Sequence, residues 1–326
     1  MTVTSKPILL ISGVCGDIGC SAVRSLRDAA GRIIGCDMRP YSPVHDLLDG
    51  FYEVPAAVKA EQYLQRIKDI LSRERISFFL PIPEPEIRLI DENRDEMEGL
   101  GPKLLLNNRT IVRNFLDKLK TAQFLGAAGV KAPRTELLQD YKGGYGFPVI
   151  VKPITGYGSK RLWRAEDDAD LDYLRRKDDG LLIVQEYLGT DSDEYTTGVF
   201  SDGKTVSSIT FRRKLGFGGL SAEAALVDAP AMDELSQKIA AAVHLEGCIN
   251  IQTRLVGDTF VPFEINPRLS STVFIRKQFG FDDAVWWLDL LLGKTHQYRK
   301  RYRSGKVIRC VSECYFDMVE YERDNQ

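Results

Sequence analysis

The chain has 326 residues, 44% hydrophobic and 28% charged, a composition typical of folded proteins with enough residues for two domains. Its formal net charge of −2 gives no general case for binding nucleic acid or an anionic membrane surface. No apolar run approaches the roughly 20 residues that cross a bilayer, and the first run ends at Gly13, which predicts a strand and not a signal peptide. Six scattered cysteines without CxxC spacing argue against zinc and predict a reduced, cytoplasmic protein.

Short apolar runs alternate with helical stretches over residues 6–106. We expect strands at 8–12, 32–36, 76–80 and 103–106, and helices at 21–30, 61–74 and 86–98. Strands that alternate with helices indicate a parallel sheet, so the sequence predicts a Rossmann-like domain at 1–107.

The segment GVCGDIG, residues 13–19, follows the first strand, and Asp37 ends the next one, as in a dinucleotide-binding fingerprint. Tyr173 and Lys177 form a YxxxK pair with Ser159 upstream, so an NAD(P)-dependent oxidoreductase is an alternative function. Tight turns in parallel sheets need glycine for conformational reasons alone. The YxxxK pair lies in a charged segment typical of a solvated helix face, which favours a structural interpretation of both features.

A second pattern begins near residue 108. We expect helices at 115–129, 233–244 and 282–292, and strands at 147–153, 181–188, 195–200, 248–255 and 259–266. The last two strands read as an antiparallel hairpin.

Lys152 ends the apolar strand FPVIVKP, where a lysine is costly to bury without an anion. The run GYGSK follows, and its backbone N–H groups suit phosphate oxygens, so Gly156, Gly158 and Ser159 are candidate contacts. Lys118, near the start of an earlier helix, is a second candidate. An exposed turn with a surface lysine is the structural alternative.

The strand IVQEYL, residues 183–188, offers the backbone donor and acceptor that the edge of an adenine needs. Glu186, Tyr187 and Leu188 are the candidate residues there, and Glu194 follows at a spacing that suits ribose hydroxyls. Ordinary acids on an edge strand would give the same pattern.

The most specific pattern is the pair INIQTR and FVPFEINPR. Glu264 and Asn266 are two residues apart on one strand, so they share a face, and Gln252 comes from the neighbouring strand. Their oxygens suit magnesium between triphosphate oxygens. Arg268 follows with a fork geometry that can neutralise a phosphate.

These residues resemble the ATP-grasp superfamily, and within it the carbamoyl-phosphate synthetase large-subunit type, over nearly the whole chain. The resemblance implies an α/β and α+β fold, with the Rossmann-like domain followed by a two-lobed ATP-grasp module: an N-terminal lobe at 108–185 with the glycine-rich loop and a C-terminal lobe at 186–326 with the metal site. It implies phosphate contacts from Lys118 and Lys152, adenine contacts from Glu186 and Leu188, a ribose contact from Glu194, magnesium ligands at Gln252, Glu264 and Asn266, and Arg268 at the transferring phosphate.

The same resemblance implies an ADP-forming ligase that joins a small-molecule carboxylate to an amine, with ATP and Mg²⁺, or Mn²⁺ in its place. It also suggests a homodimer that uses neither nucleic acid nor a membrane as partner. Two departures stand out: Lys160 occupies a position where glycine is common, and the chain has one ATP-grasp module where the synthetase has two. A non-catalytic ATP-binding protein remains an alternative beside the oxidoreductase.

Overall fold

The computed structural model describes residues 6–156, 161–190, 193–216, 219, 221–295, 304–310 and 313–316. Its contacts divide the chain into two units. The first unit comprises the described residues within 1–107, 268–303 and 308–326, and the second comprises those within 108–267 and 304–307. Residues 268–303 therefore group with the first unit, while the three-domain division at 1–107, 108–185 and 186–326 stays a prediction.

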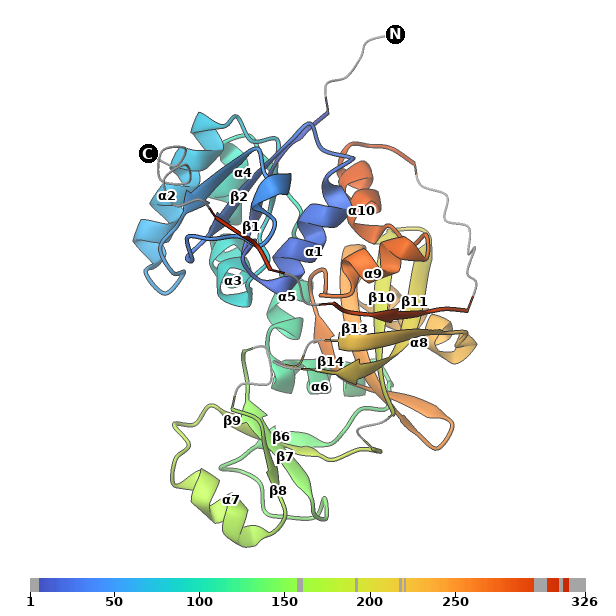
Figure 1. Cartoon of the computed structure of the whole chain (residues 1–326). Coiled ribbons are helices and arrows are strands. Elements are labelled where there is room, and N and C mark those ends of the chain that lie inside the picture. The colour runs from blue at the N-terminus through green and yellow to red at the C-terminus, as the bar shows by residue number, and fades with distance from the viewer. Residues whose placement is uncertain are drawn as a thin grey trace. The chain divides into compact units, whose positions relative to one another are not determined.

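A parallel sheet of five strands, in the order β3-β2-β1-β4-β5, forms the centre of the first unit (Figure 1). The strands are β1 (Ile8–Ser12), β2 (Arg32–Asp37), β3 (Gly50–Glu53), β4 (Phe78–Leu80) and β5 (Lys103–Leu104). β1 is buried on both faces, which is why it reads as a continuous apolar run. This confirms the predicted Rossmann-like sheet and adds β3, which had no predicted counterpart.

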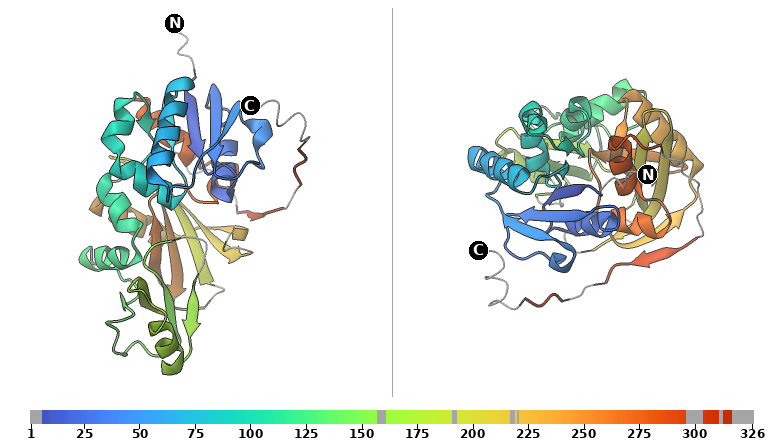
Figure 2. Two further views of the ribbon diagram at one scale, coloured as in Figure 1. Left: turned by 90° about the vertical axis from the view of Figure 1, so that its left-hand side faces the viewer. Right: turned by 90° about the horizontal axis from the view of Figure 1, so that it is seen from above.

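Helices flank this sheet (Figure 2). They are α1 (Asp17–Leu26), the 3₁₀ helix η1 (His45–Leu47), α2 (Ala60–Arg73), α3 (Glu84–Glu92), α4 (Arg94–Gly99), α9 (Val273–Gln278) and α10 (Asp283–Leu291). The helix expected at 86–98 is two helices, because Asn93 between α3 and α4 has φ −109° and ψ 21°, outside the helical range. Within the described residues, no helix combines the length and apolar character needed to cross a membrane.

The glycine loop before α1 is packed against itself. A Cβ on Gly19 would lie 2.2 Å from the carbonyl oxygen of Gly13, which itself has φ +67°. We therefore expect Gly19→Ala to lower the free energy of unfolding by about 1–3 kcal/mol, the usual cost of overpacking. Gly126→Ala is the matched control: it lies in α6 (Lys118–Ala127), a Cβ there meets nothing within 4 Å, and it should raise stability by about 0.4–1 kcal/mol. Urea denaturation compares the two, and equal stability of Gly19→Ala and wild type would contradict the steric argument.

The second unit contains two sheets. The smaller is antiparallel, in the order β6-β9-β7-β8, with β6 (Thr135–Leu137), β7 (Val149–Pro153), β8 (Trp163–Ala165) and β9 (Leu182–Glu186), and it carries helix α7 (Asp168–Arg175). Val149 and Val151 pack with Leu171 of α7 in a buried cluster. Because side chains alternate along a strand, Ile150 and Lys152 project from the other face of β7.

The larger sheet has the order β14-β13-β10-β11-β12-β15. Its strands are β10 (Glu194–Asp202), β11 (Val206–Leu215), β12 (Ser221–Val227), β13 (Glu246–Val256), β14 (Thr259–Asn266) and β15 (Lys306–Ile308). Ile249, Ile251 and Ile265 belong to a buried cluster shared with α5 (Arg109–Phe115), α6 and α8 (Pro230–Ala242), so these helices cover one face. The two sheets confirm the predicted two-lobed module.

Candidate functional site

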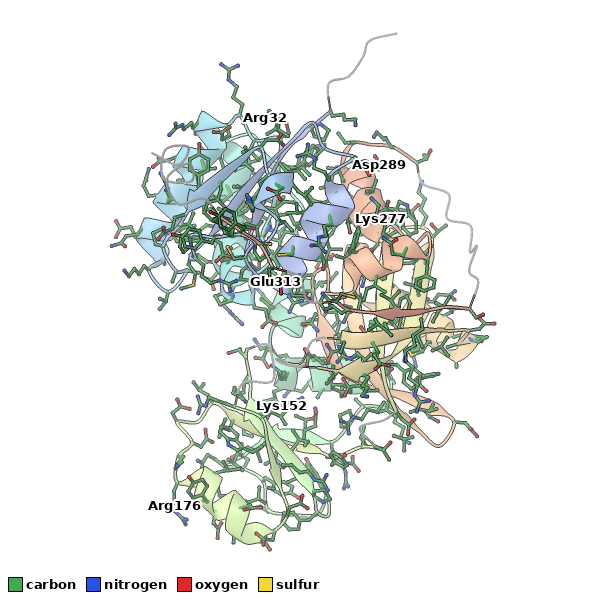
Figure 3. All side chains as sticks on the ribbon, in the orientation of Figure 1. Arg32, Lys152, Arg176, Lys277, Asp289 and Glu313 are labelled. Atoms are coloured by element: carbon green, nitrogen blue, oxygen red, sulfur yellow. The ribbon has the colours of Figure 1, made fainter. Side chains whose placement is uncertain are left out.

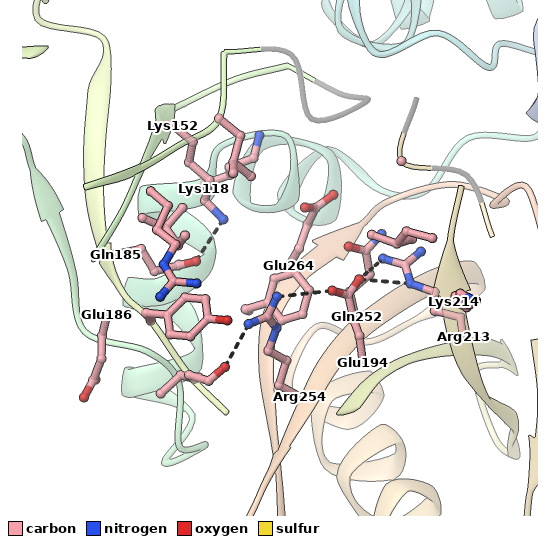
Figure 4. A pocket seen from close by; sticks show the side chains of 18 of the residues that line it. Lys118, Lys152, Gln185, Glu186, Glu194, Arg213, Lys214, Gln252, Arg254 and Glu264 are labelled. Atoms are coloured by element: carbon pink, nitrogen blue, oxygen red, sulfur yellow. Dashed lines mark hydrogen bonds and ion pairs between the residues drawn. The ribbon is translucent and has the colours of Figure 1, made fainter. Parts of the chain in front are cut away.

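A cavity of about 1040 Å³ lies in the second unit and is lined by residues of both of its sheets (Figure 4). Nine of the residues singled out from the sequence line it: Lys118, Lys152, Gly156, Glu186, Tyr187, Leu188, Glu194, Gln252 and Glu264. These residues lie up to 146 positions apart in the chain. The cavity brings them together, as expected for residues predicted to bind one ligand.

Lys152 lies at the end of β7 and is only 6% exposed (Figure 3). Its Nζ donates to Oε1 of Gln185 at 2.8 Å and lies 5.8 Å from the ring centre of Phe263. Burial lowers the pKa of Lys152 to about 8, and the charge of Lys118 acts in the same direction, while Glu264 opposes it. Burial destabilises the charged form of this ammonium group, so an anion that binds beside it stabilises that form.

Lys118 is the first residue of α6. Asp117 caps the helix by accepting a hydrogen bond from the backbone N–H of Lys120 at 2.9 Å, which is why α6 begins here and not at the predicted residue 115. Nζ of Lys118 donates to the carbonyl oxygen of Gly156 at 2.7 Å, and Gly156 has φ +119°. This contact joins the helix start to the beginning of the glycine-rich loop.

Glu264 faces Gln252 across the β13–β14 pair, as the sequence predicted for neighbouring strands. Nδ2 of Asn266 donates to Oε1 of Glu264 at 3.0 Å. Burial raises the pKa of Glu264, but the charges of Lys118 and Lys152 and the amide of Asn266 outweigh it, so the pKa lies below its usual value. The carboxylate is therefore held ionised among cations.

A bulge shapes this end of the cavity. Gln252 pairs with Glu264 while the next residue, Thr253, pairs with Pro262, so Phe263 has no partner in the register. Phe263 and Glu264 both line the cavity although they are adjacent on one strand. A bulge re-aims side chains in this way, and bulges are over-represented beside active sites.

Glu194 is 5% exposed and already engaged by two arginines. Nε of Arg213 donates to its Oε1 at 3.0 Å, and Nη2 of Arg254 lies 3.5 Å from its Oε2. Its carboxylate therefore lines the cavity as part of a charge network.

Glu186 ends β9, and its carboxylate points away from the labelled residues at the centre of Figure 4. Arg134 holds it with Nη2 at 3.2 Å and Nε at 3.3 Å from its two oxygens. Burial raises the pKa of Glu186, but the hydrogen bonds and charge of Arg134 reverse this and lower it. The carboxylate of Glu186 is therefore engaged by Arg134.

Arg254 is a cavity residue that the sequence analysis did not single out. Its guanidinium carbon lies 5.0 Å from the ring centre of Tyr187, and its Nη1 donates to the carbonyl oxygen of Leu188 at 2.9 Å. The signal was present in INIQTR, because Ile249 and Ile251 are buried and Gln252 and Arg254 therefore alternate onto the open face.

Two predicted residues within the described part of the chain, Arg268 and Asn266, are not among those that line this cavity. Arg268 belongs to the first unit, where it is 7% exposed and its Nη2 donates to Oε1 of Glu84 at 3.1 Å. Within the described residues, Nε of Arg268 is buried and has no hydrogen-bond partner. Asn266 is bonded to Glu264, which does line the cavity. Gly158 and Ser159 lie outside the described residues.

The features behind the oxidoreductase alternative belong to different units. In the first, the carboxylate of Asp37 accepts hydrogen bonds from the backbone N–H groups of Cys15 and Arg39, both at 2.9 Å. Since Cys15 belongs to the glycine loop, Asp37 binds the backbone of that loop. In the second, Tyr173 of α7 contacts Lys177, which lies two residues beyond the end of that helix, near the surface residue Arg176 (Figure 3). Both side chains are exposed, as the structural interpretation expected, although only Tyr173 belongs to the helix.

Two family models match the chain. Residues 8–105 match one described as "PylC-like, N-terminal domain", and residues 178–314 match one described as "ATP-grasp in the biosynthetic pathway with Ter operon". The first match covers the parallel sheet, and the second covers the larger sheet with the predicted metal ligands.

Similarity to known proteins extends over most of the chain. The C-terminal section of the carbamoyl phosphate synthase large chain of Aquifex aeolicus strain VF5 is 23% identical over 317 residues, with 89% of this chain and 57% of the relative covered. The chain thus spans little more than half of that curated relative and 21% of a full large chain from Rubrobacter xylanophilus.

Two solved structures share the fold. The biotin carboxylase domain of the Hydrogenobacter thermophilus 2-oxoglutarate carboxylase, solved with MgADP, ADP and bicarbonate, has a TM-score of 0.70 at 15% identity and covers 90% of this chain and 71% of its own. An L-amino acid ligase from Bacillus licheniformis also has a TM-score of 0.70 at 15% identity, with coverages of 88% and 75%.

Proposed function

Because this chain belongs to the ATP-grasp superfamily, we propose that it is an ATP-dependent ligase that activates a carboxylate as an acyl phosphate and joins it to an amine. The observation that carries the proposal is the meeting of Lys118, Lys152 and Glu264 at one cavity, since two ammonium groups around one ionised carboxylate suit a metal–triphosphate. The fold shared with an amino acid ligase supports the same reaction class.

In the proposed complex, ATP occupies the cavity of the second unit. Lys118, Lys152 and the loop from Gly156, with Gly158 and Ser159, receive the phosphates. The main chain from Glu186 through Tyr187 to Leu188 receives the adenine, next to apolar surface from Ile150 and Phe263. Glu194 accepts a hydrogen bond from a ribose hydroxyl. It can do so while Arg213 donates to it, because each carboxylate oxygen accepts more than one hydrogen bond.

The residues fit a magnesium ion. Glu264 supplies one ionised carboxylate, and Gln252 and Asn266 supply amide oxygens once Asn266 turns its oxygen inward. Magnesium is commonly held by one or two carboxylates together with substrate phosphates, so this sparse set is sufficient when ATP is present. Manganese accepts the same oxygen ligands.

The reaction is proposed in two displacements. The substrate carboxylate oxygen attacks the γ-phosphorus of ATP and the bond to the bridging oxygen breaks, so ADP leaves and an acyl phosphate forms. The amine nitrogen then attacks the acyl carbon, the carbon–oxygen bond breaks, and inorganic phosphate leaves with the proton that the amine releases. Lys118 and Lys152 stabilise the charge that develops on the transferring group. When bound, magnesium supplies further neutralisation and orients the phosphates.

Ligand-induced stabilisation separates this proposal from its alternatives. At 100-fold excess over its Kd, a ligand stabilises its protein by about 2.7 kcal/mol, so Mg-ATP should raise the unfolding temperature clearly and NADH should not. Stabilisation by NADH alone would reject the proposal in favour of the oxidoreductase. ADP release on adding pools of carboxylates and amines then distinguishes a ligase from a non-catalytic ATP-binding protein. A cytoplasmic location and a homodimer belong to the same proposal, the first because six scattered cysteines without CxxC spacing are typical of a reduced protein.

A further inference from the structure

The cavity of the second unit carries more positive charge than a magnesium–triphosphate requires. Among the described residues, eight cationic side chains line it: Lys118, Lys152, Arg164, Arg212, Arg213, Lys214, Arg254 and Lys306. Four anionic side chains line it: Glu186, Glu194, Glu223 and Glu264. The lining therefore has an excess of four positive charges.

Ion pairs with residues behind the lining reduce this excess only slightly. Arg164 pairs with Glu166 at 2.8 Å and Arg212 with Asp193 at 3.1 Å, while Arg134 pairs with Glu186. Counting these partners leaves an excess of three. Mg-ATP brings about two negative charges, because the cation cancels half of the triphosphate's charge. The reacting carboxylate of the substrate takes up one further charge, so the lining is balanced if one metal binds, and two positive charges remain for another anion if a second metal binds.

The position of the charges matters more than their sum, because a local excess of positive charge lies at one end of the larger sheet. Lys214 of β11 and Lys306 of β15 flank Glu223 of β12: Nζ of Lys214 lies 3.8 Å from Oε1 of Glu223, and Nζ of Lys306 contacts Oε2. Two ammonium groups around one carboxylate leave one net positive charge, and each ammonium has three donors, more than its contact with Glu223 uses.

This cluster is separate from the proposed nucleotide contacts. Those contacts lie on α6, β7, β10, β13 and β14, on β9 and the two residues that follow it, and in the loop from Gly156. None lies on β11, β12 or β15. In the strand order, β12 is four places from β14, which carries Glu264, or about 19 Å at the usual strand spacing. One cavity therefore joins a metal–phosphate end to a distant basic end.

We propose that Lys214, Glu223 and Lys306 bind an anionic group of the carboxylate substrate, distinct from the carboxylate that reacts. The substrate is thus a dianion or higher, whose second anion is a carboxylate or a phosphate ester. In the ligand-free protein, Glu223 positions the two lysines through its contacts with both. Lys306 belongs to β15, so residues 304–307 near the end of the chain complete a specificity site on the second unit. This inference rests on the proposed ligase function.

Matched pairs of probes test it by isothermal titration calorimetry. Succinate is compared with succinamate, and 3-phosphoglycerate with glycerate, each titrated into the full chain with Mg²⁺ and a non-hydrolysable ATP analogue. We expect at least one dianion to bind 5-fold or more tightly than its monoanionic match, and the pair that shows the preference identifies carboxylate or phosphate. Equal binding within both pairs, or no binding by any probe, overturns the inference.

Variants assign the preference to the cluster. The side chains of Lys214 and Lys306 are 77% and 53% exposed, so solvent screens them, and each of Lys214→Gln and Lys306→Gln should weaken dianion binding about 2- to 5-fold. The double variant should lose about 10-fold, and monoanion binding should hold. Lys204→Gln, an exposed lysine outside the cavity lining, is the matched control. A dianion preference that survives in the double variant also overturns the inference.

Nucleotide binding keeps the two proposals distinguishable. The same variants should bind the ATP analogue within 2-fold of wild type, because they leave Lys118, Lys152 and Glu264 in place. If wild type fails to bind the analogue, the proposed function is wrong. If it binds the analogue and shows no dianion preference, only the substrate inference is wrong.

Discussion

Replacing Glu264 by glutamine is expected to lower the rate of substrate-dependent ADP release by about 10²–10³, the scale of losing one preorganised electrostatic contact. The carboxylate is held ionised by Lys118 and Lys152, and in the proposed complex it is the single charged metal ligand. Glutamine keeps the volume and removes the charge. The Mg²⁺ concentration needed for half-maximal ATP binding should rise as well, which calorimetry measures independently of turnover.

Glu246→Gln is the matched control, because Glu246 is an exposed carboxylate at the start of β13, outside the cavity lining. Its ADP release and magnesium dependence should equal those of wild type. Full activity of Glu264→Gln with unchanged magnesium dependence would remove the metal site from the proposal, whatever the fold.

Replacing Lys152 by methionine is expected to weaken ATP binding about 10- to 100-fold at pH 7, the range for losing a hydrogen bond to a charged group. The pH dependence should change too. Phosphate favours the protonated lysine, and the pKa of Lys152 is about 8 without ligand, so wild-type affinity should fall above pH 8 by up to about 10-fold per pH unit. The variant should show no such fall, and titrations from pH 7 to 9.5 compare the two.

The lowered pKa of Lys152 also predicts how the free energy of unfolding changes with pH. Its pKa drops from 10.5 to about 8 on folding, so between these values the unfolded chain binds more protons than the native one. The free energy of unfolding therefore gains a term that increases as pH rises from 8 to 10.5, and this term is absent below pH 8. The difference between wild type and Lys152→Met in urea denaturation isolates it, and Lys142→Met, at an exposed lysine, is the control. If the difference in the free energy of unfolding between wild type and Lys152→Met stays constant with pH, the pKa of Lys152 is not lowered by burial.

Much of the fold followed from local periodicity. β1, buried on both faces, gave a continuous apolar run, and the alternation in INIQTR and FVPFEIN marked two strands with one open face. Strands β6, β8, β11 and β12 escaped prediction. β6 and β8 are short and half buried, and β11 and β12 mix buried and partly exposed positions without a regular alternation. β15 escaped because its three residues become a strand only beside β12.

By itself, the sequence determined the pattern from which the proposed metal–triphosphate residues are predicted: a lysine that ends an apolar strand, and oxygen-bearing side chains at alternate positions of two strands. Only the tertiary structure decided how charges pair across the fold. In the structure, Glu186 pairs with Arg134 and Glu194 with Arg213. A bulge turns Phe263 toward the cavity, and Lys306 lies beside Glu223. Such pairings depend on strand order and register between segments distant in the chain, and a local pattern carries no information about either.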